Sequence, residues 1–116
     1  MKIQDRFDYF LKKIKNAIAV SLVDDEGEII LYSFNKDSIS DDDVRLFSAH
    51  IVHTMAKTIN SKNPEEMFFY NDRYSAFTKR LKENLVLLII FEGTAFKGYA
   101  RLHAEDIIEQ VEEEFF

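Results

Sequence analysis

The stretch Asn84-Leu85-Val86-Leu87-Leu88-Ile89-Ile90-Phe91-Glu92 decides the fold of this chain. Its apolar residues are all branched or aromatic, and a polar residue closes the run at each end. A membrane-spanning helix needs roughly 20 apolar residues, so the run is too short to cross a bilayer. Since apolar and polar residues do not alternate along it, the run predicts a strand buried on both faces of a sheet.

The composition limits what surrounds this strand. The chain has 116 residues, of which 47% are hydrophobic, and it has no cysteine. We therefore expect one domain over residues 1–116, without disulfides, thiolate metal sites or a cysteine nucleophile. The net charge of −6, without a basic cluster, argues against nucleic acid as the principal partner. The first residues mix acids and bases and show no signal peptide, which predicts a cytoplasmic protein without membrane insertion.

Hydrophobic periodicity predicts the other elements. The expected order is α-β-β-α-β-β-β-α, with helices over about residues 3–15, 40–60 and 95–116 and strands over 17–23, 28–34, 66–70, 73–81 and 84–92. Ser40 precedes three aspartates, a typical helix start. Gly27 and the pair Asn71-Asp72 tolerate positive φ, which predicts two tight hairpin turns. Ala17–Val23 is apolar or small on both faces, so we expect it beside the central strand.

The second helix carries two stripes. One is an ordinary core face of apolar residues, namely Val44, Phe47, Ile51, Met55 and Thr58. The other has small residues at its middle and consists of Arg45, Ala49, Val52, Ala56 and Ile59. A helix that covers one sheet face needs only the first stripe, so the second predicts a contact with another surface. The alternative is that this helix is buried more deeply within its own chain.

Catalytic patterns are absent from the sequence. His50 and His53 lie three residues apart and could bind a metal only if ligands converged from elsewhere, because no H-E-x-x-H pattern exists. The sequence has no nucleophile elbow and no glycine-rich phosphate loop. Asp24-Asp25-Glu26 lacks calcium-loop spacing and fits a solvated turn. We therefore expect no enzymatic activity, no cofactor and no metal, although a low-weight alternative is an enzyme that uses His50 or His53.

The order of elements resembles the roadblock/dynein light chain family. The similarity lies in Ala17–Ile29, an apolar strand with an acidic-glycine turn and a second strand, and in Asn84–Glu92 followed by the last helix. Two departures are the missing glycine early in the first strand and a short first helix that begins almost at Met1.

This resemblance implies an α/β (α+β) three-layer sandwich of the profilin-like or roadblock type. Its five-stranded antiparallel sheet would carry the long helix on one face and the terminal helices on the other. Family members pair sheet edges and long helices into homodimers or heterodimers, and they regulate or scaffold small Ras-like GTPases. The residues expected at the dimer or partner interface are Arg45, Ala49, Val52, Ala56 and Phe69. None of the arginines Arg45, Arg73, Arg80 and Arg101 is identifiable as an arginine finger.

The rival hypothesis is a small-molecule sensor or protein-interaction domain of the PAS or profilin-like kind. Its elements come in similar numbers, and its ligand would lie between sheet and helix. The residues expected to line that site are Phe68, Tyr70, Phe77 and Phe91. A buried ligand in a monomeric protein would favour the sensor, whereas a dimer that binds a GTPase would favour the roadblock resemblance.

Overall fold

The computed structural model describes residues 2–57, 66–94 and 97–116, with only the backbone at positions 56, 57 and 97. Its elements follow the expected order. They are α1 (Ile3–Lys13), β1 (Ala17–Val23), β2 (Ile29–Phe34), α2 (Asp41–Lys57), β3 (Glu66–Tyr70), β4 (Tyr74–Arg80), the short 3-10 turn η2 (Lys82–Asn84), β5 (Val86–Glu92) and α3 (Lys97–Phe115). The end expected for the second helix, about residue 60, and the start expected for the last helix, about residue 95, fall in residues outside this description.

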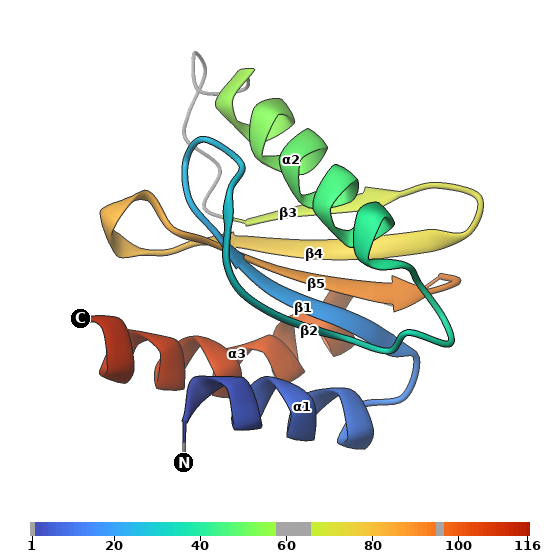
Figure 1. Cartoon of the computed structure of the whole chain (residues 1–116), viewed down its shortest axis with the longest axis horizontal. Coiled ribbons are helices and arrows are strands. Elements are labelled where there is room, and N and C mark those ends of the chain that lie inside the picture. Colours follow the sequence, from blue (N-terminus) through green and yellow to red (C-terminus); the bar gives the residue numbers. More distant parts are fainter. Residues whose placement is uncertain (1, 58–65, 95–96) are drawn as a thin grey trace.

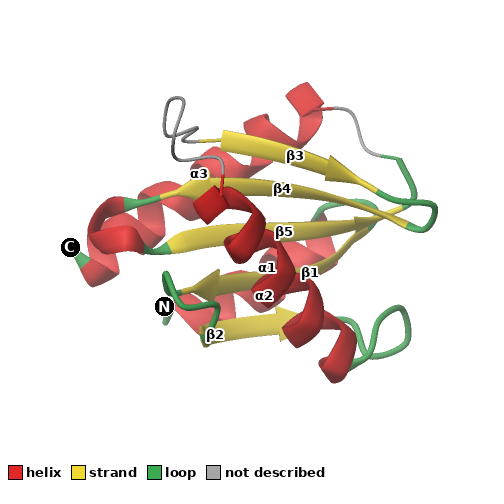
Figure 2. Cartoon of the chain, turned by 90° about the horizontal axis from the view of Figure 1, so that it is seen from above, coloured by secondary structure: helices red, strands yellow, loops and turns green. Residues whose placement is uncertain are grey.

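The strands form one antiparallel sheet in the order β2-β1-β5-β4-β3. The central strand is β5, with β1 on one side and β4 on the other, as Figure 2 shows. Residues Val86 to Phe91 are all buried, which confirms that the apolar run is covered on both faces. β1 is also buried along its whole length, because it lies beside β5 beneath helices on both sides.

Helices cover the two faces of the sheet in separate layers (Figure 1). On one face, α1 and α3 enclose a core that includes Phe7, Phe77 and Phe91. On the other face, α2 encloses a core that includes Val44, Ile51 and Ile90. The α/β three-layer architecture expected from the sequence is therefore confirmed. Phe115, the last residue of α3, is 40% exposed.

Local chemistry explains where the second helix begins. The Ser40 hydroxyl accepts a hydrogen bond from the Asp43 N–H at 3.1 Å, as a helix N-cap does. Farther along, the hydroxyls of Ser48 on α2 and Ser21 on β1 lie 3.2 Å apart in the core and satisfy each other. These two small side chains let the helix backbone come close to the centre of the sheet without leaving a polar group unpaired.

The two predicted hairpin turns differ in mechanism. Gly27 has φ +90°, which confirms the left-handed turn between β1 and β2. Neither Asn71 nor Asp72 has a positive φ, so that part of the prediction was wrong. Instead, the Asn71 side-chain oxygen accepts from the N–H groups of Arg73 and Tyr74 at 2.8 and 2.7 Å, because an asparagine can close a turn through its own amide.

Within the described ranges, no helix of this protein is both long enough and apolar enough to cross a membrane.

Candidate partner-binding surface on α2 and β3

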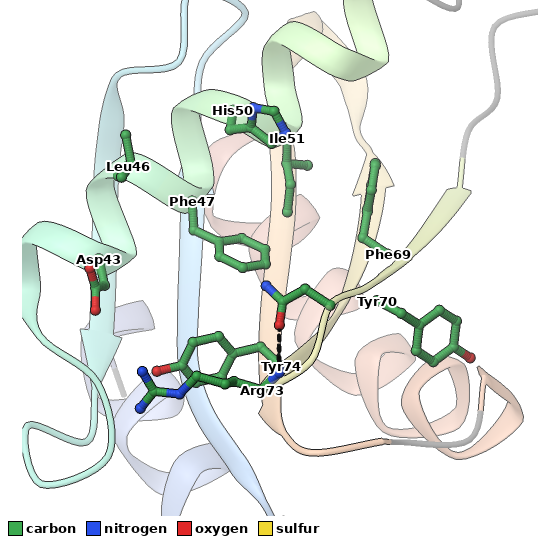
Figure 3. Close-up of a pocket in the computed structure, with 10 residues that line it drawn as sticks. Asp43, Leu46, Phe47, His50, Ile51, Phe69, Tyr70, Arg73 and Tyr74 are labelled. Carbon is green, nitrogen blue, oxygen red and sulfur yellow. Dashed lines mark hydrogen bonds between the residues drawn. The ribbon is translucent and has the colours of Figure 1, made fainter.

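A groove of about 570 Å³ separates α2 from the hairpin of β3 and β4 (Figure 3). The helix contributes Asp43, Leu46, Phe47, His50 and Ile51, and the hairpin contributes Phe69, Tyr70, Asn71, Arg73 and Tyr74. In Figure 3, Phe47 and Ile51 point from the helix toward the strands, while Tyr70 points away from the helix. The groove is thus mostly apolar, and charged residues lie at its ends.

The position of α2 keeps this groove open. The helix packs mainly on β1 and β2, which lie toward the edge of the sheet opposite to β3. Phe47 reaches Tyr74 edge-on, with ring centroids 6.2 Å apart, but Phe69 is only partly buried. Leu46 on the helix is 71% exposed. Apolar side chains in this arrangement are left half covered within the single chain, as is typical of a partner site.

The sheet edge beside the groove is bare. β3 is the last strand of the sheet, and no described strand pairs with its outer side. Asn71 N–H donates to Tyr74 O at 2.9 Å, which fixes the hydrogen-bonded pairs of the β3–β4 ladder. Because such pairs alternate in an antiparallel ladder, the N–H and C=O groups of Phe68 and Tyr70 face outward. An unpaired row of this kind is a template for another strand.

The opposite edge, β2, is protected. A register irregularity interrupts its pairing with β1 near Val23. The Gln4 side chain on α1 donates to the Tyr32 carbonyl at 2.9 Å, and the Ser33 hydroxyl donates to Asp8 of α1. A bulge and a covering helix are two common devices that stop edge pairing. The two edges therefore differ, and β3 is the one that can accept a strand.

Ion pairs fix the bare edge in place. Glu66, the first residue of β3, accepts from Arg101 Nε of α3 at 3.0 Å and lies 3.7 Å from Lys79 Nζ of β4. The carboxylate therefore joins the edge strand to its neighbour and to the helix beneath it. We expect this arrangement to limit fraying of the strand, so that the edge is presented in a defined position.

The structure does not gather the five residues expected at the interface. Phe69 lines the groove, but Arg45, Ala49 and Val52 lie on the side of α2 that faces the β1–β2 hairpin. Ala49 packs under Gly27, since a Cβ built on that glycine would lie 3.3 Å from Ala49 Cα. Val52 is only 5% exposed. The side chain of Ala56 falls outside the described residues. Their role at an interface stays a prediction, with most of the second stripe used inside the chain.

Arg45 is held by its neighbours. Its Nε donates to Asp41 at 2.8 Å, and its guanidinium donates to the Tyr32 hydroxyl at 3.0 Å. The Tyr32 hydroxyl also donates to Asp41. These contacts lower the pKa of Asp41, mainly through the Tyr32 hydrogen bond and then through Arg45. They raise the pKa of Arg45, chiefly through Asp41. This cluster connects the start of α2 to β2, so the contacts of Arg45 within the chain hold these two elements together.

The sites proposed for metal or ligand chemistry are dispersed. His50 and His53 are exposed on α2, and no group of three His, Cys, Asp or Glu within the described ranges could hold a metal ion. Phe77 and Phe91, expected to line a sensor cavity, are buried in the core beneath α1 and α3, and Phe68 packs against the same core. Tyr70 is exposed, and its ring lies 4.7 Å from that of Phe68 between centroids. These four aromatic residues therefore fill the core and its border, and neither the groove beside α2 nor a second groove between α1 and α3 is lined by Phe68, Phe77 or Phe91.

The fold of this chain is found in proteins of known structure that differ from it widely in sequence. At the level of sequence, neither a protein family nor a curated protein gives a significant match. Among solved structures, a roadblock/LC7 domain from Streptomyces avermitilis matches 99% of this chain and 98% of its own, with a TM-score of 0.78 and 8% identity. The chain has the roadblock fold. Two further structural neighbours are MglB proteins.

The first of these is MglB of Myxococcus xanthus, with a TM-score of 0.77, 21% identity and coverage of 99% of this chain and 95% of that one. The second is the gliding protein MglB of Thermus thermophilus, with a TM-score of 0.73, 16% identity and coverage of 94% and 87%. At identities this low, the structural likeness establishes the fold alone, and the function has to be argued from the surface of this protein.

Sequence reasoning missed the residues that carry the open surface. Leu46 and Tyr70 are exposed large side chains beside the groove. Leu46 could have been found as an apolar residue on the histidine side of the helix, where a solvated face should be polar. Tyr70 had no such signal, because a strand alone does not reveal whether it lies at an edge.

Proposed function

We propose that this protein forms a two-fold dimer through β3 and α2, and that the dimer binds a small Ras-like GTPase as a regulator without an active site of its own. The observation that carries the proposal is the bare β3 edge beside a half-covered apolar groove. Each feature alone could face solvent, but together they leave both backbone and apolar groups of one surface unsatisfied.

A second copy of the chain fits this surface. The β3 strands of two copies can pair antiparallel about a two-fold axis at Phe68. This pairing places the outward backbone N–H and C=O groups of Glu66 in one copy opposite those of Tyr70 in the other. An axis perpendicular to the sheet keeps both α2 helices on one face of the joined sheet. The same two-fold rotation therefore places the grooves of the two copies beside each other and covers Leu46. Another roadblock protein could replace the second copy and give a heterodimer.

The GTPase is inferred from the fold. The resemblance to roadblock proteins implies such a partner, and the likeness to gliding proteins favours a role in motility or polarity. In this protein Arg45 is already engaged with Asp41 and Tyr32. We therefore expect the protein to act by reordering the catalytic groups of the GTPase, which would place it in the cytoplasm.

The dimer is tested with a proline at the bare edge. Tyr70→Pro removes an outward N–H that is not needed for pairing with β4, whereas the control Tyr70→Ala keeps that N–H. Light scattering at high salt, which screens any association through charged surfaces, should show a dimer for wild type and Tyr70→Ala and a monomer for Tyr70→Pro. A Tyr70→Pro protein that remains folded and fully dimeric would refute pairing through β3.

The partner is tested with the small Ras-like GTPases of the source organism, each loaded with GDP or with a non-hydrolysable GTP analogue. Titration calorimetry should show binding of one GTPase to the wild-type dimer, with affinity that depends on the nucleotide. The Tyr70→Pro monomer should bind that GTPase more weakly. Failure of all loaded GTPases to bind a protein that is dimeric would refute the regulatory role while leaving the dimer intact.

A further inference from the structure

A second groove lies on the opposite face of the molecule, between α1 and α3. These helices run side by side beneath the sheet, as Figure 1 shows. The groove has a volume of about 460 Å³, and its floor includes the core residues Phe10, Ile14 and Ile107. The roadblock dimer proposed above uses the other face of the sheet and does not cover this groove.

The charges of this groove are divided between its two walls. Among the residues that line it, the charged groups of α1 are the cations Arg6 and Lys13. Those of α3 are the anions Glu105 and Asp106. Within the described part of the chain, no ion pair joins these cations to these anions. Opposite charges thus face one groove without neutralising each other across it.

Each wall also carries an exposed apolar side chain. Tyr9 on α1 is 58% exposed, and Leu102 on α3 is 64% exposed. The groove therefore exposes apolar and charged groups that its own chain leaves unmatched.

We propose that this groove binds the same groove of a second copy of the chain. A two-fold axis that runs along the groove would place α1 of each copy over α3 of the other. The cationic wall of one copy then meets the anionic wall of its mate, twice, and Tyr9 and Leu102 of opposite copies cover each other. A face whose charges are divided in this way is complementary to itself, which is the requirement for a two-fold interface.

This contact is independent of the β3 edge. Because the two surfaces lie on opposite faces of the sheet, both can be occupied at once. Two different two-fold contacts on one chain generate an assembly larger than a dimer. We therefore expect dimers made through β3 to associate further through α1 and α3, in a reaction that weakens as salt screens the facing charges.

The test uses two charge-reversed proteins. The first, Arg6→Glu/Lys13→Glu, makes both walls negative, and the second, Glu105→Lys/Asp106→Lys, makes both walls positive. Both are built with Tyr70→Pro, so that association through β3 is absent. Analytical ultracentrifugation and energy transfer between labelled chains then measure the α1–α3 contact alone. At low salt, where the facing charges are not screened, the reference protein with Tyr70→Pro only should self-associate.

Each charge-reversed protein alone should associate at least tenfold more weakly than the reference. An equal mixture of the two should recover association as a heterodimer, because every facing pair of walls is then opposite in sign. The control Lys36→Glu/Lys82→Glu changes the charge equally at exposed sites outside the groove and should leave association unchanged. Absence of self-association in the reference, or a mixture that behaves as the sum of its parts, would overturn the proposal. Loss of the β3 dimer would not affect this result.

Discussion

The exposed Leu46 of α2 provides a quantitative test of the β3–α2 dimer. Full burial of a leucine side chain contributes about 1.5–3 kcal/mol. Since Leu46 is 71% exposed in the single chain, covering the remainder would contribute about 1–2 kcal/mol per copy. The two-fold axis doubles the effect, so the substitution Leu46→Asp should cost the dimer about 2–4 kcal/mol. This corresponds to an increase of about 30- to 700-fold in the dimer dissociation constant.

The assay is sedimentation equilibrium over a range of concentrations for wild type and Leu46→Asp. The matched control is Ile30→Asp, which places the same charge on an exposed apolar residue of the protected β2 edge. Leu46→Asp should lower the stability of the isolated chain by no more than about 0.5 kcal/mol, because that side chain is largely solvated. Ile30 is 48% exposed, so its replacement should cost the chain about 1 kcal/mol, and both variants are compared as folded proteins. A Leu46→Asp dimer as tight as that of Ile30→Asp would show that α2 is not buried between copies.

Three further predictions concern the single chain. Ser48→Ala leaves the buried Ser21 hydroxyl without its partner and should lower the free energy of unfolding by about 1–2 kcal/mol in urea titrations. The double variant with Ser21→Ala should lose less than the sum of the two single losses, and strict additivity would contradict the pairing. Gly27→Ala forces a side chain into a left-handed position against Ala49 and should cost about 1–3 kcal/mol. Gly93→Ala, with φ +73° and no heavy atom within 4 Å, should cost less, and equal losses would exclude crowding as the cause. Asp41→Asn should lower Tm at pH 7, and the difference from wild type should shrink below about pH 4. The lowered pKa of Asp41 means that its contribution is present above the ordinary carboxyl pKa and is lost as protons bind; a difference that grows in acid would contradict this sign.

The fold could be predicted from the sequence because its signals are local. The apolar run around Ile89 requires cover on both faces, and this requirement placed β5 at the centre of the sheet. Ser40 specifies a helix start through its hydroxyl, and Gly27 permits a left-handed turn because it has no side chain. The Asn71 turn was placed correctly for the wrong reason, since an asparagine can close a turn either by positive φ or through its amide.

The candidate site could be predicted only in part. The second stripe of α2 predicted a contact with another surface, but Ala49 packs under Gly27 inside the chain, as the alternative of deeper burial within the chain implies. Sequence periodicity shows that a side chain needs cover without showing what covers it. Phe69 was expected at a dimer or partner interface from the edge position that the resemblance implied, and in the structure it lines the groove. The exposed position of Leu46 depends on where the helix lies across the sheet, which no local pattern specifies.

The cover that α1 gives to β2 also bears on aggregation. A sheet with two bare ends can add chains without limit, which is the geometry of amyloid fibrils. Gln4 and Asp8 hold α1 against one end of this sheet, so growth through the other end stops once two chains have joined. The N-terminal helix therefore limits edge-to-edge pairing of the sheet to the single edge at β3. A chain that lost its first ten residues would expose both edges and would be expected to form fibres.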